Sequence, residues 1–120
     1  PPSAAALHAK RIRTEAQQLR ENERLCFSIL SDYAHVLRDW KVRYAPQSPA
    51  EAPDERFVEA CHKLDEVEYY LDILTSGNSY ERSEVIHQQM ANGKLDRLRQ
   101  RLEKIHEGEI EDGYDTADVA

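Results

Sequence analysis

The sequence predicts an all-α fold, an antiparallel three-helix bundle whose first helix is unusually long and coiled-coil-like. The main observation is a run of apolar residues at alternating steps of four and three, with no proline or glycine inside it. Two later segments repeat this period, and the 32% charged residues and four glycines suit helices with solvated faces. Eleven of the twelve positions in the first run are apolar: Ala5, Ala9, Ile12, Ala16, Leu19, Glu23, Cys26, Leu30, Tyr33, Leu37, Trp40 and Tyr44.

The first helix is expected over residues 3–44, with Ser3 as its N-cap. Its first half carries a narrow, alanine-rich apolar stripe, whereas from Leu25 onward apolar residues cover more than half of the circumference. A helix that is apolar on so many sides must be enclosed by more than one neighbour. We therefore expect the second half of this helix to carry the core.

A proline-containing linker at residues 45–53 should separate the first helix from a second over residues 54–75, with Asp54 at its N-cap. Gly77 should end the second helix in the left-handed conformation. Asn78 and Glu81 match a capping box for a third helix over residues 79–106, with a kink or short break expected at Asn92-Gly93. The predicted core comprises Leu25, Cys26, Ile29, Leu30, Tyr33, Leu37, Trp40, Phe57, Cys61, Leu64, Val67, Leu71, Leu74, Ile86, Leu95, Leu98, Leu102 and Ile105.

Residues 1–106 should form one helical domain, and residues 107–120 should form a separate acidic tail. The tail has no apolar period, carries six acidic residues without a basic one, and contains two glycines. Such a segment buries too little apolar surface to offset its ordering entropy, so we expect it to be disordered.

Several function classes are disfavoured. A net charge of −7 argues against a general nucleic-acid binder, and no apolar run is long enough to cross a membrane. The histidines and cysteines show no metal-ligand spacing, and there is no glycine-rich phosphate loop, so we expect no metal, no cofactor and no enzymatic activity. Cys26 and Cys61 both fall on apolar stripes, which indicates reduced thiols in an intracellular protein of the cytoplasm or nucleus; a disulfide would require a suitable helix register.

Charge is distributed unevenly along the predicted helices. The second helix is strongly acidic, whereas the third carries a basic stripe on one face: Lys94, Arg97, Arg101 and Lys104. Either these charges pair across neighbouring helices, or the basic stripe receives an acidic partner, phosphate groups or the acidic tail.

The length of the first helix leads to a functional hypothesis. The second helix should run back only as far as Glu23, leaving residues 3 to about 20 uncovered over roughly 25–30 Å. We expect this segment to bind a helix from a second copy or from a different, acidic protein. The expected partner-binding residues are the apolar stripe and three flanking charges: Ala5, Ala9, Ile12, Ala16, Leu19, Lys10, Arg13 and Arg20.

An alternative function is suggested by Ala34-His35-Val36-Leu37-Arg38. This stretch resembles the Ala-His-x-Leu-Lys start of the phosphorylated helix in histidine phosphotransfer domains, which are all-helical and of similar size. The resemblance implies a signalling bundle in which His35 accepts a phosphoryl group. The sequence departs from that family after these five residues, because Asp39 and Trp40 stand where the family has a glycine that gives access to the receiver domain.

Overall fold

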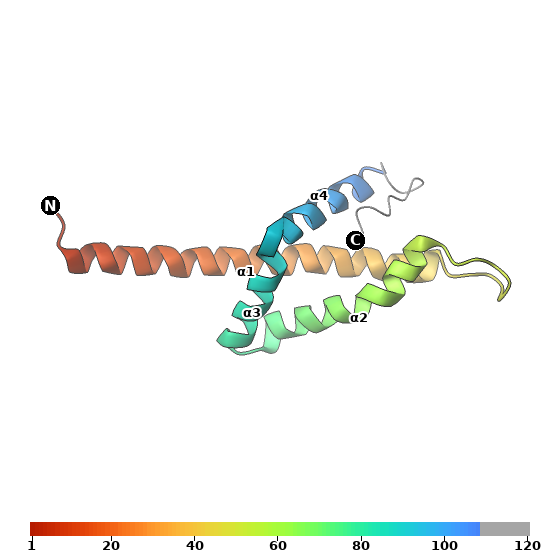
Figure 1. Ribbon diagram of the computed structural model, residues 1–120, viewed down its shortest axis with the longest axis horizontal. Coiled ribbons are helices and arrows are strands. Elements are labelled where there is room, and N and C mark those ends of the chain that lie inside the picture. Colours follow the sequence, from red (N-terminus) through yellow and green to blue (C-terminus); the bar gives the residue numbers. More distant parts are fainter. Residues whose placement is uncertain (109–120) are drawn as a thin grey trace.

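The computed structural model describes residues 1–108 and is all-helical over that range (Figure 1). Its elements are α1 (Ala4–Arg43), α2 (Glu55–Ser76), α3 (Ser79–Met90), a 3-10 turn (Ala91–Gly93) and α4 (Lys94–His106). The three predicted helical segments are therefore confirmed, the third being divided into α3 and α4. The prediction of a disordered tail lies, from residue 109 onward, outside the described residues.

The first helix, α1, is a single straight rod of 40 residues. Ser3 caps its start, since the Ser3 hydroxyl accepts a hydrogen bond from the Ala6 amide at 3.1 Å. The Tyr44 amide donates to the Trp40 carbonyl at its end. The helix gives the molecule its elongated shape, with extents of 72 × 29 × 19 Å.

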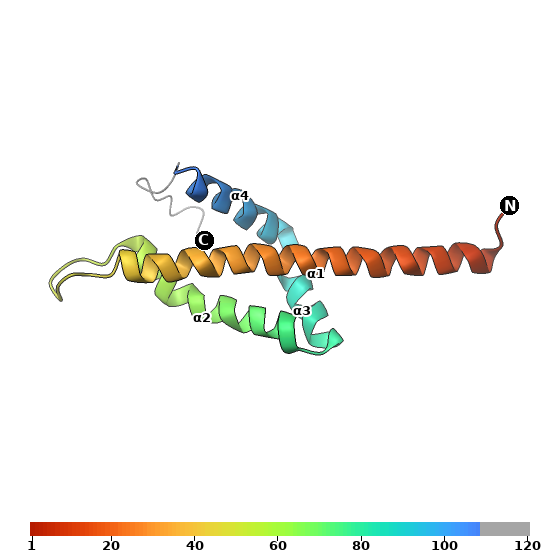
Figure 2. The ribbon, with the colours of Figure 1, turned by 180° about the vertical axis from the view of Figure 1, so that it is seen from behind.

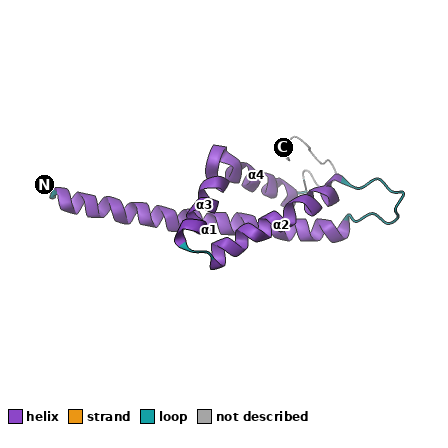
Figure 3. Cartoon of the chain, turned by 60° about the horizontal axis from the view of Figure 1, so that its bottom comes forward, coloured by secondary structure: helices purple, strands orange, loops and turns teal. Residues whose placement is uncertain are grey.

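The other helices gather around the C-terminal half of α1. After the linker, α2 runs back antiparallel to α1, α3 crosses α1 near its middle, and α4 returns toward the linker end (Figure 2). The end of α4 is tied to α1 through the His106 ring, whose Nε2 lies 2.9 Å from an Asp32 carboxylate oxygen. The N-terminal half of α1 extends beyond all three helices in the view of Figure 3 as well.

The core lies between these helices and the C-terminal half of α1. Most of the predicted core residues are buried in it or packed against it. Leu25 is an exception, being 44% exposed, because it lies to the side of the face that α2, α3 and α4 cover. Core residues that the pattern missed are Ala34, Val36, Ala60 and Val85.

The prediction that Cys61 belongs to the core is wrong. Its neighbour Ala60 faces α1 instead, which turns the Cys61 thiol outward. Cys26 is fully buried, and both cysteines are free, so the structure contains no disulfide between them. Phe57 is only partly buried and does not belong to the central cluster.

The predicted helix starts are confirmed, but the expected geometry of Gly77 is not. Asp54 accepts a hydrogen bond from the Arg56 amide at 2.8 Å, and Asn78 with Glu81 forms a complete capping box. Gly77 has φ of −75°, which is extended rather than left-handed. Its missing side chain is required for a different reason, because a Cβ there would lie 2.6 Å from the Ile73 carbonyl oxygen.

The break between α3 and α4 falls at the predicted place. Asn92 and Gly93 both take left-handed backbone angles, with φ of 57° and 69°. Asparagine and glycine are the residues that adopt this conformation most readily. The break redirects the chain so that α3 crosses α1 while α4 follows α1 back toward the linker.

Candidate functional site

Residues 4–22 of α1, which we call the projecting segment, extend away from the rest of the described chain. Its three large aliphatic side chains are about half exposed: Leu7 at 54%, Ile12 at 51% and Leu19 at 54%. Such values mean that no neighbouring helix covers them. The N-terminal half of α1 is thus uncovered, as the length of the second helix predicted.

Local features keep this segment helical. Alanine, the best helix former, is frequent in it. Side-chain hydrogen bonds between residues four apart reinforce it: Gln17 donates to Glu21 at 3.2 Å and Gln18 donates to Asn22 at 2.9 Å. Because the helix continues into the packed bundle, it does not bear the nucleation cost that makes short isolated helices marginal.

The predicted partner-binding residues lie together on this segment. The stripe of Ala5, Ala9, Ile12, Ala16 and Leu19 forms one face, in which only Ala9 and Ala16 are partly shielded. Leu7, which sequence reasoning did not single out, is two residues from Ala5 and Ala9 and so projects from the opposite face. Lys10, Arg13 and Arg20 are exposed beside the stripe.

The projecting segment ends at Glu23, the single polar residue in the apolar seam. The Arg82 guanidinium of α3 donates to the Glu23 carboxylate at 2.9 Å, so the start of the bundle is marked by an ion pair between α1 and α3. One turn further, Cys26 is enclosed in the core. Burial, with a smaller contribution from the Glu23 charge, raises the pKa of the Cys26 thiol to about 11.

Three arginines in or next to the projecting segment differ from the arginines of the bundle in their pairing. Every arginine from Arg38 to Arg101 has an acceptor within residues 1–108, such as Glu68 at 3.2 Å from Arg38. By contrast, the side chains of four basic residues, which we call the basic row, have no ion-pair partner in that part of the chain. They lie along one flank of the apolar stripe: Lys10, Arg13, Arg20 and Arg24.

The second predicted basic stripe, on α4, does not form a continuous surface. Lys94, Arg97 and Lys104 are exposed, and the Arg97 guanidinium donates to the backbone carbonyl of Asn92. Arg101 is only 5% exposed and pairs with Glu59 of α2, so at this position the charge is paired across neighbouring helices, the first of the two interpretations of the stripe. It points toward α2 and pairs there instead of facing solvent.

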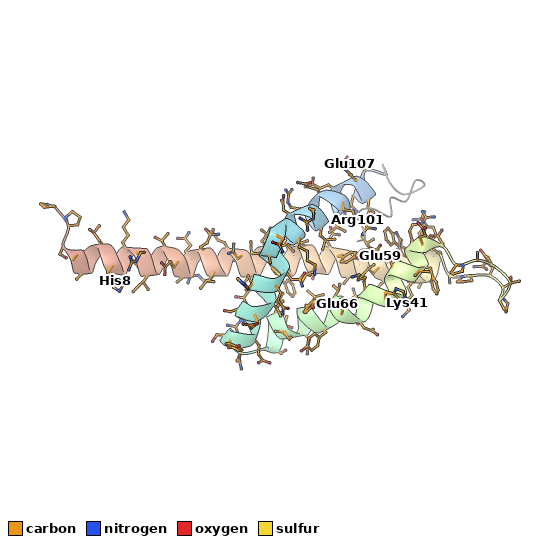
Figure 4. All side chains as sticks on the ribbon, viewed as in Figure 1. His8, Lys41, Glu59, Glu66, Arg101 and Glu107 are labelled. Atoms are coloured by element: carbon orange, nitrogen blue, oxygen red, sulfur yellow. The ribbon has the colours of Figure 1, made fainter. Side chains whose placement is uncertain are left out.

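Arg101 belongs to a buried polar cluster that joins three helices. Its two terminal nitrogens donate to the Glu59 carboxylate of α2 at 2.6 and 2.8 Å, and the Tyr33 hydroxyl of α1 donates to the same carboxylate at 2.8 Å (Figure 4). The Arg101 guanidinium also lies 5.7 Å from the centre of the Trp40 ring. Sequence reasoning missed Glu59 because a glutamate beside an apolar stripe resembles any solvated helix residue.

His35, the residue behind the alternative function, is exposed on α1. Trp40, which occupies the region where the phosphotransfer family has a glycine, is 3% exposed and faces the core. The Trp40 indole therefore points away from the side of the helix that carries the His35 imidazole. Asp39, one turn after His35, is exposed, and its carboxylate lies 3.8 Å from the Arg43 guanidinium.

Other site types receive no support from the described residues. Within residues 1–108, no three histidine, cysteine or acidic side chains come together in an arrangement suited to a metal ion. None of the helices in that range combines the length and apolar character needed to cross a bilayer.

Comparisons with models of protein families, with curated proteins and with solved structures find no match to this chain.

Proposed function

We propose that this chain is a non-enzymatic protein-interaction module that pairs with a helix of another chain along the projecting segment. The supporting observation is the half exposure of Ile12 and Leu19 on one continuous stripe of a helix that has no neighbour there. Full burial of an aliphatic side chain of this size is worth about 1.5–3 kcal/mol. Covering the stripe with a partner helix would therefore contribute several kcal/mol to binding. Part of this contribution is offset by the entropy lost on association.

The alternating sizes along the stripe suit helix packing. Alanines at positions 5, 9 and 16 let a partner backbone approach closely, while Ile12 and Leu19 can insert between its side chains. The bundle contributes a rigid base, because α2 and α3 fix α1 from Glu23 onward. Both a second copy and a different protein are partners of this general kind.

The test is the double substitution Ile12→Asp with Leu19→Asp. The bundle should fold normally, since neither side chain belongs to the core, and the free energy of unfolding measured in urea should change by no more than about 0.5 kcal/mol, as expected for surface changes. Helix pairing, measured by light scattering and by crosslinking of captured partners to α1, should be lost because two charges now lie in the interface.

Leu7→Asp provides a matched control. Leu7 is as exposed as Leu19 and lies on the same segment, but on the opposite face. This variant should keep the association. Equal association in the double variant and the control would place any interface elsewhere on the molecule, whereas unfolding of the double variant would show that the projecting segment belongs to the core.

A further inference from the structure

The geometry and charges of the projecting segment decide between the two kinds of partner. If the proposed pairing occurs, its occupant must lie against the apolar stripe and beside the basic row of Lys10, Arg13, Arg20 and Arg24. A second copy can do so either parallel or antiparallel to the first. Each orientation meets a specific obstacle.

A parallel second copy is blocked by the bundle. The apolar seam continues from Leu19 into Cys26, Leu30 and Tyr33, where α2 packs on it. A seam of period 3.5 on a straight helix turns by about 20° per heptad, so over the three heptads from Ile12 to Tyr33 the exposed stripe and the covered seam diverge by about 60° and still lie on the same side of α1. Two parallel α1 helices about 8–10 Å apart would have to accommodate both α2 helices, each about 10–12 Å wide, between them.

An antiparallel second copy avoids this collision but opposes like charges. With Ala16 opposite Ile12 of the other copy, Ala9 lies opposite Leu19 and the apolar sizes fit well. In an antiparallel pair, however, each flank of one helix lies against the same flank of the other helix. The basic row of one copy therefore lies beside the basic row of the second copy. Arg13 then faces the Arg13 of the other copy and Arg20 lies near its Lys10, while Glu15 faces Glu15 on the other flank. Juxtaposed like charges disfavour such a partner.

We propose that the projecting segment binds an amphipathic helix of a different protein, with large aliphatic residues on its apolar stripe and acidic residues on its flank. The aliphatic residues fit over Ala5, Ala9 and Ala16. The acidic flank lies along the basic row, whose four side chains are exposed and have no ion-pair partner in residues 1–108. Such complementary charge raises the association rate and selects partner and orientation.

The experiment uses the full chain and two synthetic helical peptides of about three heptads. Both have leucine at the two stripe positions of each heptad; one carries glutamate at the flanking positions and the other lysine. Like charges on its own flanks discourage each peptide from pairing with itself. Binding is measured by fluorescence anisotropy of the labelled peptide, and the association state of the chain alone is measured by sedimentation equilibrium.

The expected result is a monomeric chain that binds the glutamate peptide at least about tenfold more tightly than the lysine peptide. In about 1 M salt, where the Debye length is about 3 Å, most of this difference should disappear. The double variant Arg13→Glu with Arg20→Glu, which leaves two positive and two negative charges in the row, should remove the preference. Lys94→Glu with Lys104→Glu, which changes the same charge on exposed positions of α4, should leave it unchanged.

The outcomes separate this inference from the proposed function on which it rests. Self-association of the pure chain that Ile12→Asp with Leu19→Asp abolishes would support the proposed function and overturn the inference, because the partner would be a second copy. Equal binding of both peptides would support helix pairing but overturn selection by the basic row. A monomeric chain that binds neither peptide would overturn both.

Discussion

At the residue scale, the main polar contact inside the bundle is one buried cluster that joins three helices. Glu59 and Arg101 are 4% and 5% exposed and are held by two short hydrogen bonds, to which Tyr33 adds a third on the same carboxylate. These residues come from α2, α4 and α1. The cluster therefore links three helices through hydrogen bonds to one carboxylate, and its parts depend on one another because an unpaired member would be a buried polar group or charge.

Removing one member of this pair should be costly. Arg101→Met leaves the Glu59 carboxylate buried without its main partner, and the free energy of unfolding should fall by about 3–5 kcal/mol. The combined change Glu59→Met with Arg101→Met should recover most of that loss, because no charge then remains buried. Urea unfolding followed by circular dichroism measures both. A single variant as stable as the natural protein would contradict the buried pairing.

Tyr33 should make the fold sensitive to alkali. Burial, together with the neighbouring Glu59 carboxylate, raises the pKa of the Tyr33 hydroxyl well above its ordinary value of about 10. Above pH 10 the unfolded chain loses this proton while the folded protein keeps it, so unfolding releases a proton. The stabilisation is thus complete below about pH 10 and declines as the pH rises, by up to about 1.4 kcal/mol per pH unit.

The pH dependence can be assigned with two phenylalanine variants. The melting temperature of Tyr33→Phe should fall less steeply above pH 10 than that of the natural protein. Tyr69→Phe, which changes a tyrosine that is 63% exposed, should follow the natural protein. Parallel curves for all three proteins would mean that Tyr33 does not contribute to the alkaline transition.

At the element scale, the sequence predicts each helix and its caps because those signals are local. Ser3, Asp54 and the Asn78–Glu81 box act within one helical turn, and the break at Asn92-Gly93 follows from the backbone preferences of two residues. The apolar stripe of the projecting segment is likewise a local pattern. These features need no knowledge of which helix packs on which.

The features that the sequence did not predict depend on tertiary packing. Whether Cys61 or Ala60 faces α1 is set by a rotation of α2 of one residue, which a four-three pattern hardly distinguishes. The burial of Arg101 depends on Glu59, 42 positions away in the chain. The conformation of Gly77 depends on how closely the chain passes the end of α2.

The close passage at Gly77 gives a prediction for the α2–α3 connection. Gly77→Ala would place a Cβ 2.6 Å from the Ile73 carbonyl oxygen, which also accepts the Gly77 amide at 2.7 Å. The backbone must shift to relieve the contact, and we expect a loss of about 1–3 kcal/mol in the free energy of unfolding. Ser76→Ala, at an exposed neighbouring position, should change it by no more than about 0.5 kcal/mol. Equal stability of both variants would contradict the tight turn.

At the scale of the whole molecule, stability and the proposed binding reside in different halves of α1. All buried apolar residues of α1 lie between Cys26 and Trp40, within the part that α2, α3 and α4 surround. The projecting segment contributes length, an apolar stripe and three of the four residues of the basic row, but no core residue. The long helix therefore joins a folded base to the proposed binding surface without a flexible linker.

This division predicts the effect of removing residues 1–20. The free energy of unfolding should change by no more than about 0.5 kcal/mol, because the deleted part has no contact with the core. The urea dependence of that free energy should also change little, since it follows the surface that the bundle exposes on unfolding. Binding of the glutamate peptide should be abolished. A truncated chain that unfolds more easily by 2 kcal/mol or more, about what burial of one aliphatic side chain is worth, would mean that the segment packs on the bundle in solution.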